Sequence, residues 1–293
     1  MFKFKFNTKT LAYLALLTAL LMVFSFTPIG TIPIGPLSIT LNIIPVAIAA
    51  IALGPIGGLI IGSVFGILSY LQCFSIGVPS GMGIILVGID PVLAFIQRFV
   101  PRALDGFLVG LIYQYLYKLF KEHDSNLLTT VFGLIVGALL ICAGTLVIRA
   151  GIGKNAAAEA AEHPGTAFII FGAVAAAIGL AFIVLSVINK ISNRIKKDSI
   201  SPACFIAGFL SAFLNTLFFM SALILLFGNT EYVQKLMAGR NAIAFIIAFV
   251  GVNALVEMIV STLFSGIIGT ALYGAKLLPI TEKECKKRRN KNK

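Results

Sequence analysis

Apolar residues form long runs along this chain, and polar residues are concentrated in the short connections between them. The runs are about 16 to 30 residues long and hold few charges. A helix of about 20 apolar residues is long enough to cross the hydrocarbon core of a bilayer. The pattern therefore predicts an all-α fold, a polytopic bundle of membrane-spanning helices.

The runs predict eight transmembrane helices within a single membrane domain, 1–293. Both ends of each run are set by polar, glycine-rich or proline-rich residues. The predicted helices are 10–26, 38–53, a third ending near 71, 101–120, 126–148, 166–189, 202–228 and 241–275.

Prolines and glycines divide the first half of the chain. Segment 27–37 holds three prolines and two glycines, so we expect a stiff extended loop rather than helix. The turn GPIGG at 54–58 is short and predicts an antiparallel helical hairpin. The breakers between 72 and 99 predict a partly structured outer loop.

Charge sets the expected topology. Of the 23 Lys and Arg residues, 17 fall at the two ends and in the connections 118–121 and 190–197. Basic residues are retained on the cytoplasmic side, so both termini are expected there, in a multi-pass protein of a prokaryotic plasma membrane. The net charge of +12 follows this pattern instead of forming a basic face, which argues against a nucleic-acid partner.

Three charged residues lie beside long apolar stretches, namely Arg98, Arg102 and Asp105. Pro101 suits the first turn of a helix, so we expect a helix over 101–120 with Arg98 in a less regular approach segment. Arg102 and Asp105 are three apart and share a face. Either these two pair while Arg98 reaches the headgroups, or the arginines form a cationic floor for an anionic or strongly polar ligand.

Other polar side chains in apolar surroundings complete the candidate binding set. On the last helix Asn253 and Glu257 are four apart and share a face. Glu257 could carry protons in a secondary transporter, pair with an arginine or accept hydrogen bonds from ligand hydroxyls. The candidate substrate-binding residues are Arg98, Arg102, Gln97, Asn42, Gln72, Asn253, Glu257 and Asn215.

Catalytic motifs are absent from the sequence. It contains no Walker A motif, no HExxH, no GxSxG and no CxxC, and its two histidines lie in polar connections. The four cysteines are isolated, without metal-ligand spacing. We therefore expect neither an enzyme nor a bound metal or cofactor.

Small residues recur at four-residue spacing in two places. Ala15 and Ala19 on the first helix allow close approach of another helix, and Ala12 extends this patch. Gly58, Gly62 and Gly66 form a flat stripe on the third. The stripe either packs inside the bundle or joins the alanine face to grip a partner protein.

Several segments together resemble the substrate-binding (S) component of an energy-coupling factor (ECF) vitamin transporter. These are the Ala-x-x-x-Ala of the first helix, ITLNIIPVAIAAIALGPIGGLIIGSVFGILS, FVPRALDGFLVGLIYQYLYK and VNALVEMIVSTLFSGIIGTAL. The similarity covers 8–120 and 200–275. It implies core helices one to four with outer loops in 8–120, an inserted helix pair in 126–197, core helices five and six in 200–275 and a basic cytoplasmic tail in 276–293.

The resemblance also implies a function. An S component binds a vitamin at its outer side and delivers it inward with a transmembrane coupling subunit and two cytoplasmic ATPase subunits. Ala12, Ala15 and Ala19 match the docking face for the coupling subunit. The IPVAIAAIALGP and PRAL..G pattern leans toward pantothenate and folate carriers, and two arginines suit a carboxylate.

Two alternatives remain open from the sequence. Riboflavin is one, because Phe95, Phe99 and Phe26 could stack a flat ring. A stand-alone proton-coupled transporter of a small polar solute, using Glu257, is the other.

Overall fold

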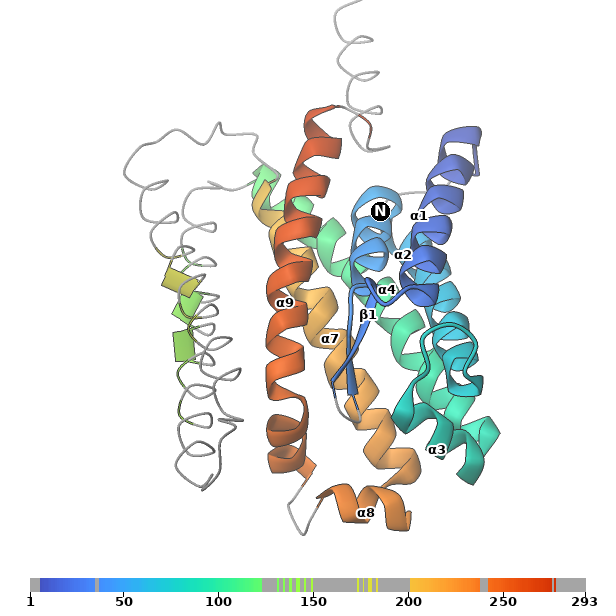
Figure 1. Ribbon diagram of the computed structural model, residues 1–293. Coiled ribbons are helices and arrows are strands. Elements are labelled where there is room, and N and C mark those ends of the chain that lie inside the picture. The colour runs from blue at the N-terminus through green and yellow to red at the C-terminus, as the bar shows by residue number, and fades with distance from the viewer. Residues whose placement is uncertain are drawn as a thin grey trace, which may run out of the picture.

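A computed structural model describes residues 6–34, 37–122, 201–237, 242–275 and 277, together with scattered residues between 131 and 183. These residues form a bundle of long helices with two short helices at one end and a small β-hairpin against its side (Figure 1). The long helices are α1 (Thr8–Phe26), α2 (Ile43–Leu71), α4 (Pro91–Glu122), α7 (Ser201–Phe227) and α9 (Ala242–Gly274).

Helix α2 is a helical hairpin, as the sequence predicts. Gly54 interrupts it with a left-handed backbone, φ 78°. A side chain placed on Gly58 would touch Ala50, eight residues earlier, which a straight helix would hold about 12 Å away. The two arms therefore lie side by side, and the described part of the bundle contains six long helical segments.

Four stretches are long and apolar enough to cross a membrane. They are Thr8–Phe26, Ile43–Phe74, Ala203–Phe227 and Ala254–Gly274, within the described residues. Helix α4, which contains six charged residues, is not among them, yet it packs against α2 and α7 as a central member of the bundle.

The predicted all-α class is confirmed, with one small addition. Segment 27–37, expected to be an extended loop, contributes to a two-stranded antiparallel hairpin of β1 (Thr31–Ile34) and β2 (Leu37–Thr40). Pro33 pairs with Ser38 in the register of this hairpin. A two-stranded hairpin tolerates such a proline because each strand is an edge. Helix α2 consequently begins at Ile43, later than the predicted residue 38.

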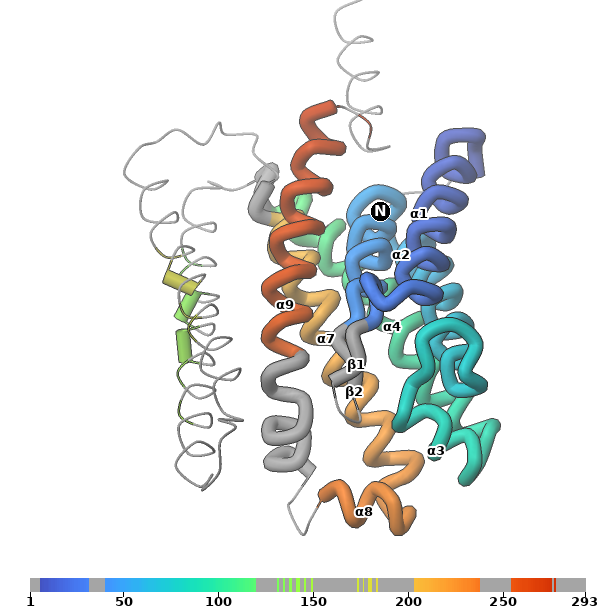
Figure 2. Tube along the Cα trace, in the orientation of Figure 1, coloured from blue at the N-terminus to red at the C-terminus, as the bar shows by residue number. Residues whose placement is uncertain are grey.

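The predicted outer loop at 72–99 is also more ordered than expected. It contains a short 3-10 helix η1 (Gln72–Phe74) and α3 (Gly81–Ile89), and α4 already begins at Pro91. Ser80 caps α3 by accepting from the Gly83 amide at 3.2 Å. A further short helix, α8 (Glu231–Met237), lies at the same end of the bundle as α3 (Figure 2).

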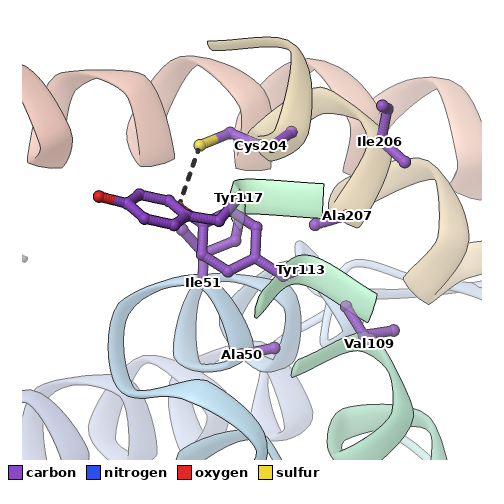
Figure 3. Packing of buried hydrophobic residues seen from close by; sticks show 9 residues of the cluster. Ala50, Ile51, Val109, Tyr113, Tyr117, Cys204, Ile206 and Ala207 are labelled. Carbon is purple, nitrogen blue, oxygen red and sulfur yellow. Dashed lines mark hydrogen bonds between the residues drawn. The ribbon is translucent and has the colours of Figure 1, made fainter. Parts of the chain in front are cut away.

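Two apolar clusters occupy opposite ends of the bundle. The first surrounds Tyr113 and Tyr117 of α4, which lie between α2 and α7, and the Tyr113 hydroxyl is 3.9 Å from the Cys204 sulfur (Figure 3). The second joins α3, α7 and α8 with the buried residues Met82, Leu86, Ala94, Met220, Leu223, Phe227, Val233 and Ala254. Along α4 and α7, the polar residues lie between these clusters.

The predicted inserted pair at 126–197 falls largely outside the described residues, as does the tail 276–293 apart from Leu277. Among the few described positions, Gly137 lies against the Gly179 carbonyl and Ile183, so the two predicted runs contact each other. The total of eight transmembrane helices is not established by the part of the chain that is described.

Candidate functional site

The site is built around α4, which carries Arg98, Arg102 and Asp105 on one face. Asp90 starts this helix by accepting from the amides of Val92 at 2.8 Å and Leu93 at 3.0 Å. The expectation that the helix begins at Pro101 is wrong, because that proline lies inside it. Residues 98, 102 and 105 are therefore spaced one helical turn apart along a single helix.

Both guanidinium groups are buried. Arg98 and Arg102 are each 5% exposed, so neither reaches solvent as a snorkelling side chain would. Arg98 donates to the Ser80 hydroxyl at 3.0 Å and to the Ser69 hydroxyl at 3.4 Å. Arg102 donates to the Arg98 carbonyl at 2.8 Å, in the turn where Pro101 supplies no amide hydrogen.

Two phenylalanine rings complete the surroundings of the arginines. The Arg102 guanidinium carbon lies 4.7 Å from the centre of the Phe65 ring and 4.9 Å from that of Phe219. Arg98 lies 5.1 Å from the same Phe219 ring. Phe65 belongs to the second arm of α2 and Phe219 to α7, so three helical segments meet at the guanidinium pair.

Asp105 does not neutralise the neighbouring arginine. Within the described residues no carboxylate lies within ion-pair distance of Arg98 or Arg102. The first of the two alternatives, an ion pair of Arg102 with Asp105, is therefore not formed. Asp105 instead accepts from the Ser211 hydroxyl on α7 at 3.0 Å. Both Nε atoms of the arginines are buried and without a partner.

Three buried amide side chains also lack hydrogen-bond partners among the described residues. Gln97 on α4 is fully buried, Asn42 is 1% exposed at the end of the hairpin, and Asn215 on α7 is 5% exposed. Both amide atoms of Gln97 and of Asn42, and the amide oxygen of Asn215, have no hydrogen-bond partner. Buried polar groups in native proteins are nearly always satisfied, so these groups need partners that the described residues do not supply.

Glu257 and Gln72 have identifiable partners. The Glu257 carboxylate, 6% exposed on α9, accepts from the Thr40 amide of β2 at 2.7 Å and lies within electrostatic reach of Arg102. This hydrogen bond therefore holds the β-hairpin beside the arginines. Gln72 donates to the Ser25 carbonyl at 3.0 Å and connects η1 to the end of α1. Asn253 lies in α9, but its side chain falls outside the described residues.

The aromatic residues expected for flavin stacking do not line this site. Phe95 stacks on Phe99 at 5.2 Å and is 37% exposed, while Phe26 is 47% exposed. Phe65 and Phe219, which do face the arginines, were not singled out from the sequence. Phe219 follows Ser211 and Asn215 at four-residue spacing, and that periodicity was the available signal.

The two small-residue stripes differ in their placement. Ala12, Ala15 and Ala19 are exposed on α1, beside exposed apolar residues such as Leu16 and Val23. Gly58, Gly62 and Gly66 are buried, and a side chain on any of them would meet the backbone of α4. The glycines therefore form an internal helix contact and do not share an exterior docking face with the alanines, which is the first of the two alternatives considered.

A comparison with protein families identifies the family of this chain. Residues 9–187 match the family described as ECF transporter, substrate-specific component. The chain belongs to this family, which comprises subunits of membrane transporters and not enzymes. The match extends beyond α4 into the segment that the sequence reading treats as an insertion. No curated protein matches the chain.

This chain is thus a substrate-specific membrane subunit of an ECF transporter. Substrate-specific components of this kind work with a coupling subunit and ATPases.

Proposed function

We propose that this subunit captures a carboxylate vitamin, with pantothenate as the first candidate and folate as the second, at Arg98 and Arg102. It delivers the vitamin inward with a transmembrane coupling subunit and two cytoplasmic ATPase subunits. The protein resides in a prokaryotic plasma membrane with both termini in the cytoplasm, as the distribution of Lys and Arg indicates.

The supporting observation is a pair of buried guanidinium groups that contact rings, hydroxyls and a carbonyl, with no carboxylate of the described residues within ion-pair distance. Glu257 and Asp105 act on Arg102 electrostatically without contacting it, so the two buried positive charges are only partly compensated. A buried charge that lacks a direct partner costs several kcal/mol. A ligand carboxylate placed between the two groups would relieve this cost and form charge-assisted hydrogen bonds of about 1.5 to 3 kcal/mol each. The unpartnered Nε atoms supply donors for it.

The amide side chains support a ligand larger than a simple anion. Gln97 and Asn42 each offer an unpartnered donor and an unpartnered acceptor. Such groups fit the amide and hydroxyl groups of pantothenate or the polar groups of folate. Riboflavin is less well supported, because Phe26 and Phe95 are exposed and Phe219 is already covered by guanidinium groups.

The exposed face of α1 fits the docking part of the proposal. Ala12, Ala15 and Ala19 offer a small-residue surface on which a helix of the coupling subunit could pack closely. Cross-linking from cysteines placed at these three positions to the coupling subunit tests this contact, with Leu225, exposed on α7, as the comparison position.

Binding measurements on the purified full chain test the substrate. Native mass spectrometry should reveal a co-purified vitamin, and pantothenate, folate and riboflavin should be titrated into the ligand-free chain. We expect Arg98→Ala and Arg102→Ala each to weaken binding of the acidic vitamin by about 2 to 5 kcal/mol, which is a loss of affinity of at least about 30-fold. The chain alone should hydrolyse no ATP.

Lys235→Ala is the matched control. Lys235 forms an exposed ion pair with Glu231 at 2.6 Å in α8. Its substitution by alanine removes one positive charge, as the arginine substitutions do, but on the surface. Its vitamin affinity should equal that of the wild type. Unchanged affinity in both arginine variants would refute the assignment of the site.

A further inference from the structure

Asp105 presents a carboxylate oxygen with no partner deep inside the bundle. The residue is 1% exposed, its Oδ2 accepts from the Ser211 hydroxyl, and its Oδ1 is unpartnered. A buried carboxylate oxygen without a donor is costly in an apolar surrounding. The position therefore needs a donor that the described residues do not supply.

Arg102 is close in sequence but does not fill this role. It lies one turn before Asp105 on the same helix face, at a spacing that permits an ion pair. Its guanidinium group instead donates to the Arg98 carbonyl and packs between Phe65 and Phe219. The Asp105 oxygen and the guanidinium groups are thus not bonded to each other, and each can bind a different part of a ligand.

A second acceptor lies on the facing helix. Asn215 follows Ser211 by one turn of α7, is 5% exposed and has an unpartnered amide oxygen. Phe219, one turn further along, contacts both arginines. Helices α4 and α7 run antiparallel, with Phe219 beside Arg102 and Ser211 beside Asp105. Asn215 therefore lies along α7 between these two contacts.

We propose that Asp105 and Asn215 form a second subsite that accepts hydrogen bonds from a hydroxyl or amide N–H group of the ligand. This subsite rests on the proposed function, since it takes the other end of a ligand whose anionic group binds Arg98 and Arg102. The ligand is thereby defined by two features, an anionic group and a donor group placed about one helical turn away, about 5 Å along the axis.

A donor group of an organic ligand fits this position better than a metal cation does. The positive charge of Arg102 lies one turn away and opposes a second full charge in a region of low dielectric constant. One Asp105 oxygen is already occupied by Ser211, and the described residues contain no cluster of three metal-ligating side chains.

The test compares each vitamin with a derivative in which one kind of donor hydrogen is replaced by a methyl group. The probes are pantothenate and its di-O-methyl ether, folate and its N-methylated amino derivative, and riboflavin and its ribityl methyl ether. Affinities are measured on the full chain in detergent for the wild type, Asp105→Asn and Thr262→Val. Thr262 is a buried hydroxyl that donates within its own helix to Met258, so its loss reports only on general damage to the core.

We expect Asp105→Asn to weaken binding of the unmodified vitamin at least tenfold, because the amide oxygen keeps the Ser211 hydrogen bond and the NH2 group then faces the ligand's donor. The affinity for the methylated derivative should stay unchanged. Thr262→Val should leave the ratio of the two affinities as it is in the wild type. Equal losses for both probes would assign Asp105 a structural role and overturn the subsite, as would no loss for either. A loss that appears only when sodium replaces choline in the buffer would indicate a cation site and also overturn it.

Failure of the proposed function gives a different result. A wild-type chain that binds neither pantothenate nor folate refutes the proposed carboxylate ligand of the arginines, and the subsite falls with it. A wild type that binds a vitamin through Arg98 and Arg102 while Asp105→Asn binds both probes as well as the wild type refutes the subsite alone.

Discussion

The Ser80 hydroxyl joins Arg98 to the start of α3. It accepts from the Arg98 guanidinium at 3.0 Å and from the Gly83 amide, the first turn of α3, at 3.2 Å. A cationic side chain of the site and the cap of a neighbouring helix therefore depend on the same oxygen.

Ser80→Ala should loosen α3 and weaken vitamin binding together. Loss of a helix N-cap costs about 0.5 to 2 kcal/mol, and Arg98 loses its shorter hydroxyl contact. Hydrogen–deuterium exchange should show faster exchange of the amides in 81–85, accompanied by lower affinity. Ser80→Thr retains the hydroxyl and should restore both properties. Unaltered exchange in the alanine variant would contradict this role.

Gly62 allows the second arm of α2 to approach α4 at the level of Arg102. A methyl group there would run into the Arg102 carbonyl oxygen, which is backbone and cannot rotate away. We expect Gly62→Ala to destabilise the chain by about 1 to 3 kcal/mol and to weaken vitamin binding by displacing Arg102. Thermal unfolding in detergent measures the first effect and titration the second.

Gly88→Ala provides the comparison for this substitution. Gly88 lies in α3 with nothing within 4 Å of an added Cβ, and alanine favours helix over glycine by about 0.5 to 1 kcal/mol. This variant should unfold at an unchanged or higher temperature. Equal stability of the two variants would show that the α2–α4 contact tolerates wider spacing.

Glu257 is expected to hold the β-hairpin in place. Its carboxylate accepts from the Thr40 amide at 2.7 Å, and Glu257→Ala removes that acceptor while Glu257→Gln keeps one. The Thr40 amide should exchange faster with deuterium in the alanine variant and near the wild-type rate in the glutamine variant. Identical exchange in all three proteins would assign the hairpin position to other contacts.

Liposomes distinguish this role from proton coupling. The chain reconstituted alone should not accumulate a vitamin when a pH gradient is imposed. Accumulation that is lost in Glu257→Gln would instead support a stand-alone secondary transporter.

Tyr113 should contribute to stability mainly through its ring. It is fully buried in the apolar cluster, and among the described residues its hydroxyl has one polar contact, with the Cys204 sulfur at 3.9 Å. Tyr113→Phe should cost less than about 1 kcal/mol, whereas Tyr113→Ala should cost about 3 to 5 kcal/mol through the cavity it leaves. Thermal unfolding of both variants checks the difference, and a large loss in the phenylalanine variant would contradict it.

Long apolar runs proved sufficient to predict the main helices. The expected 10–26, 202–228 and 241–275 agree closely with α1, α7 and α9, and the GPIGG turn correctly predicted a hairpin in α2. The start of α4 was misplaced because Pro101 satisfies the rule for a first-turn proline. Asp90 and Pro91 satisfy the same rule more completely, with a capping carboxylate as well.

The sequence was enough to predict which charged residues belong to the candidate site, but not which groups they contact. Charge within an apolar chain identified Arg98 and Arg102, since buried charge is costly. Whether Arg102 binds Asp105 or the Arg98 carbonyl depends on side-chain packing against Phe65 and Phe219. These rings belong to helices distant in sequence, and helical spacing alone cannot show which of them meet α4.

The apolar cluster around Tyr113 bears on how a captured molecule leaves. Its side chains fill the space between α2, α4 and α7 at one end of the bundle, and no polar route past the arginines is formed there by the described residues. A vitamin held at the guanidinium pair therefore cannot simply continue straight through this conformation. Release on the far side would require those helices to separate or the whole subunit to change its orientation in the bilayer.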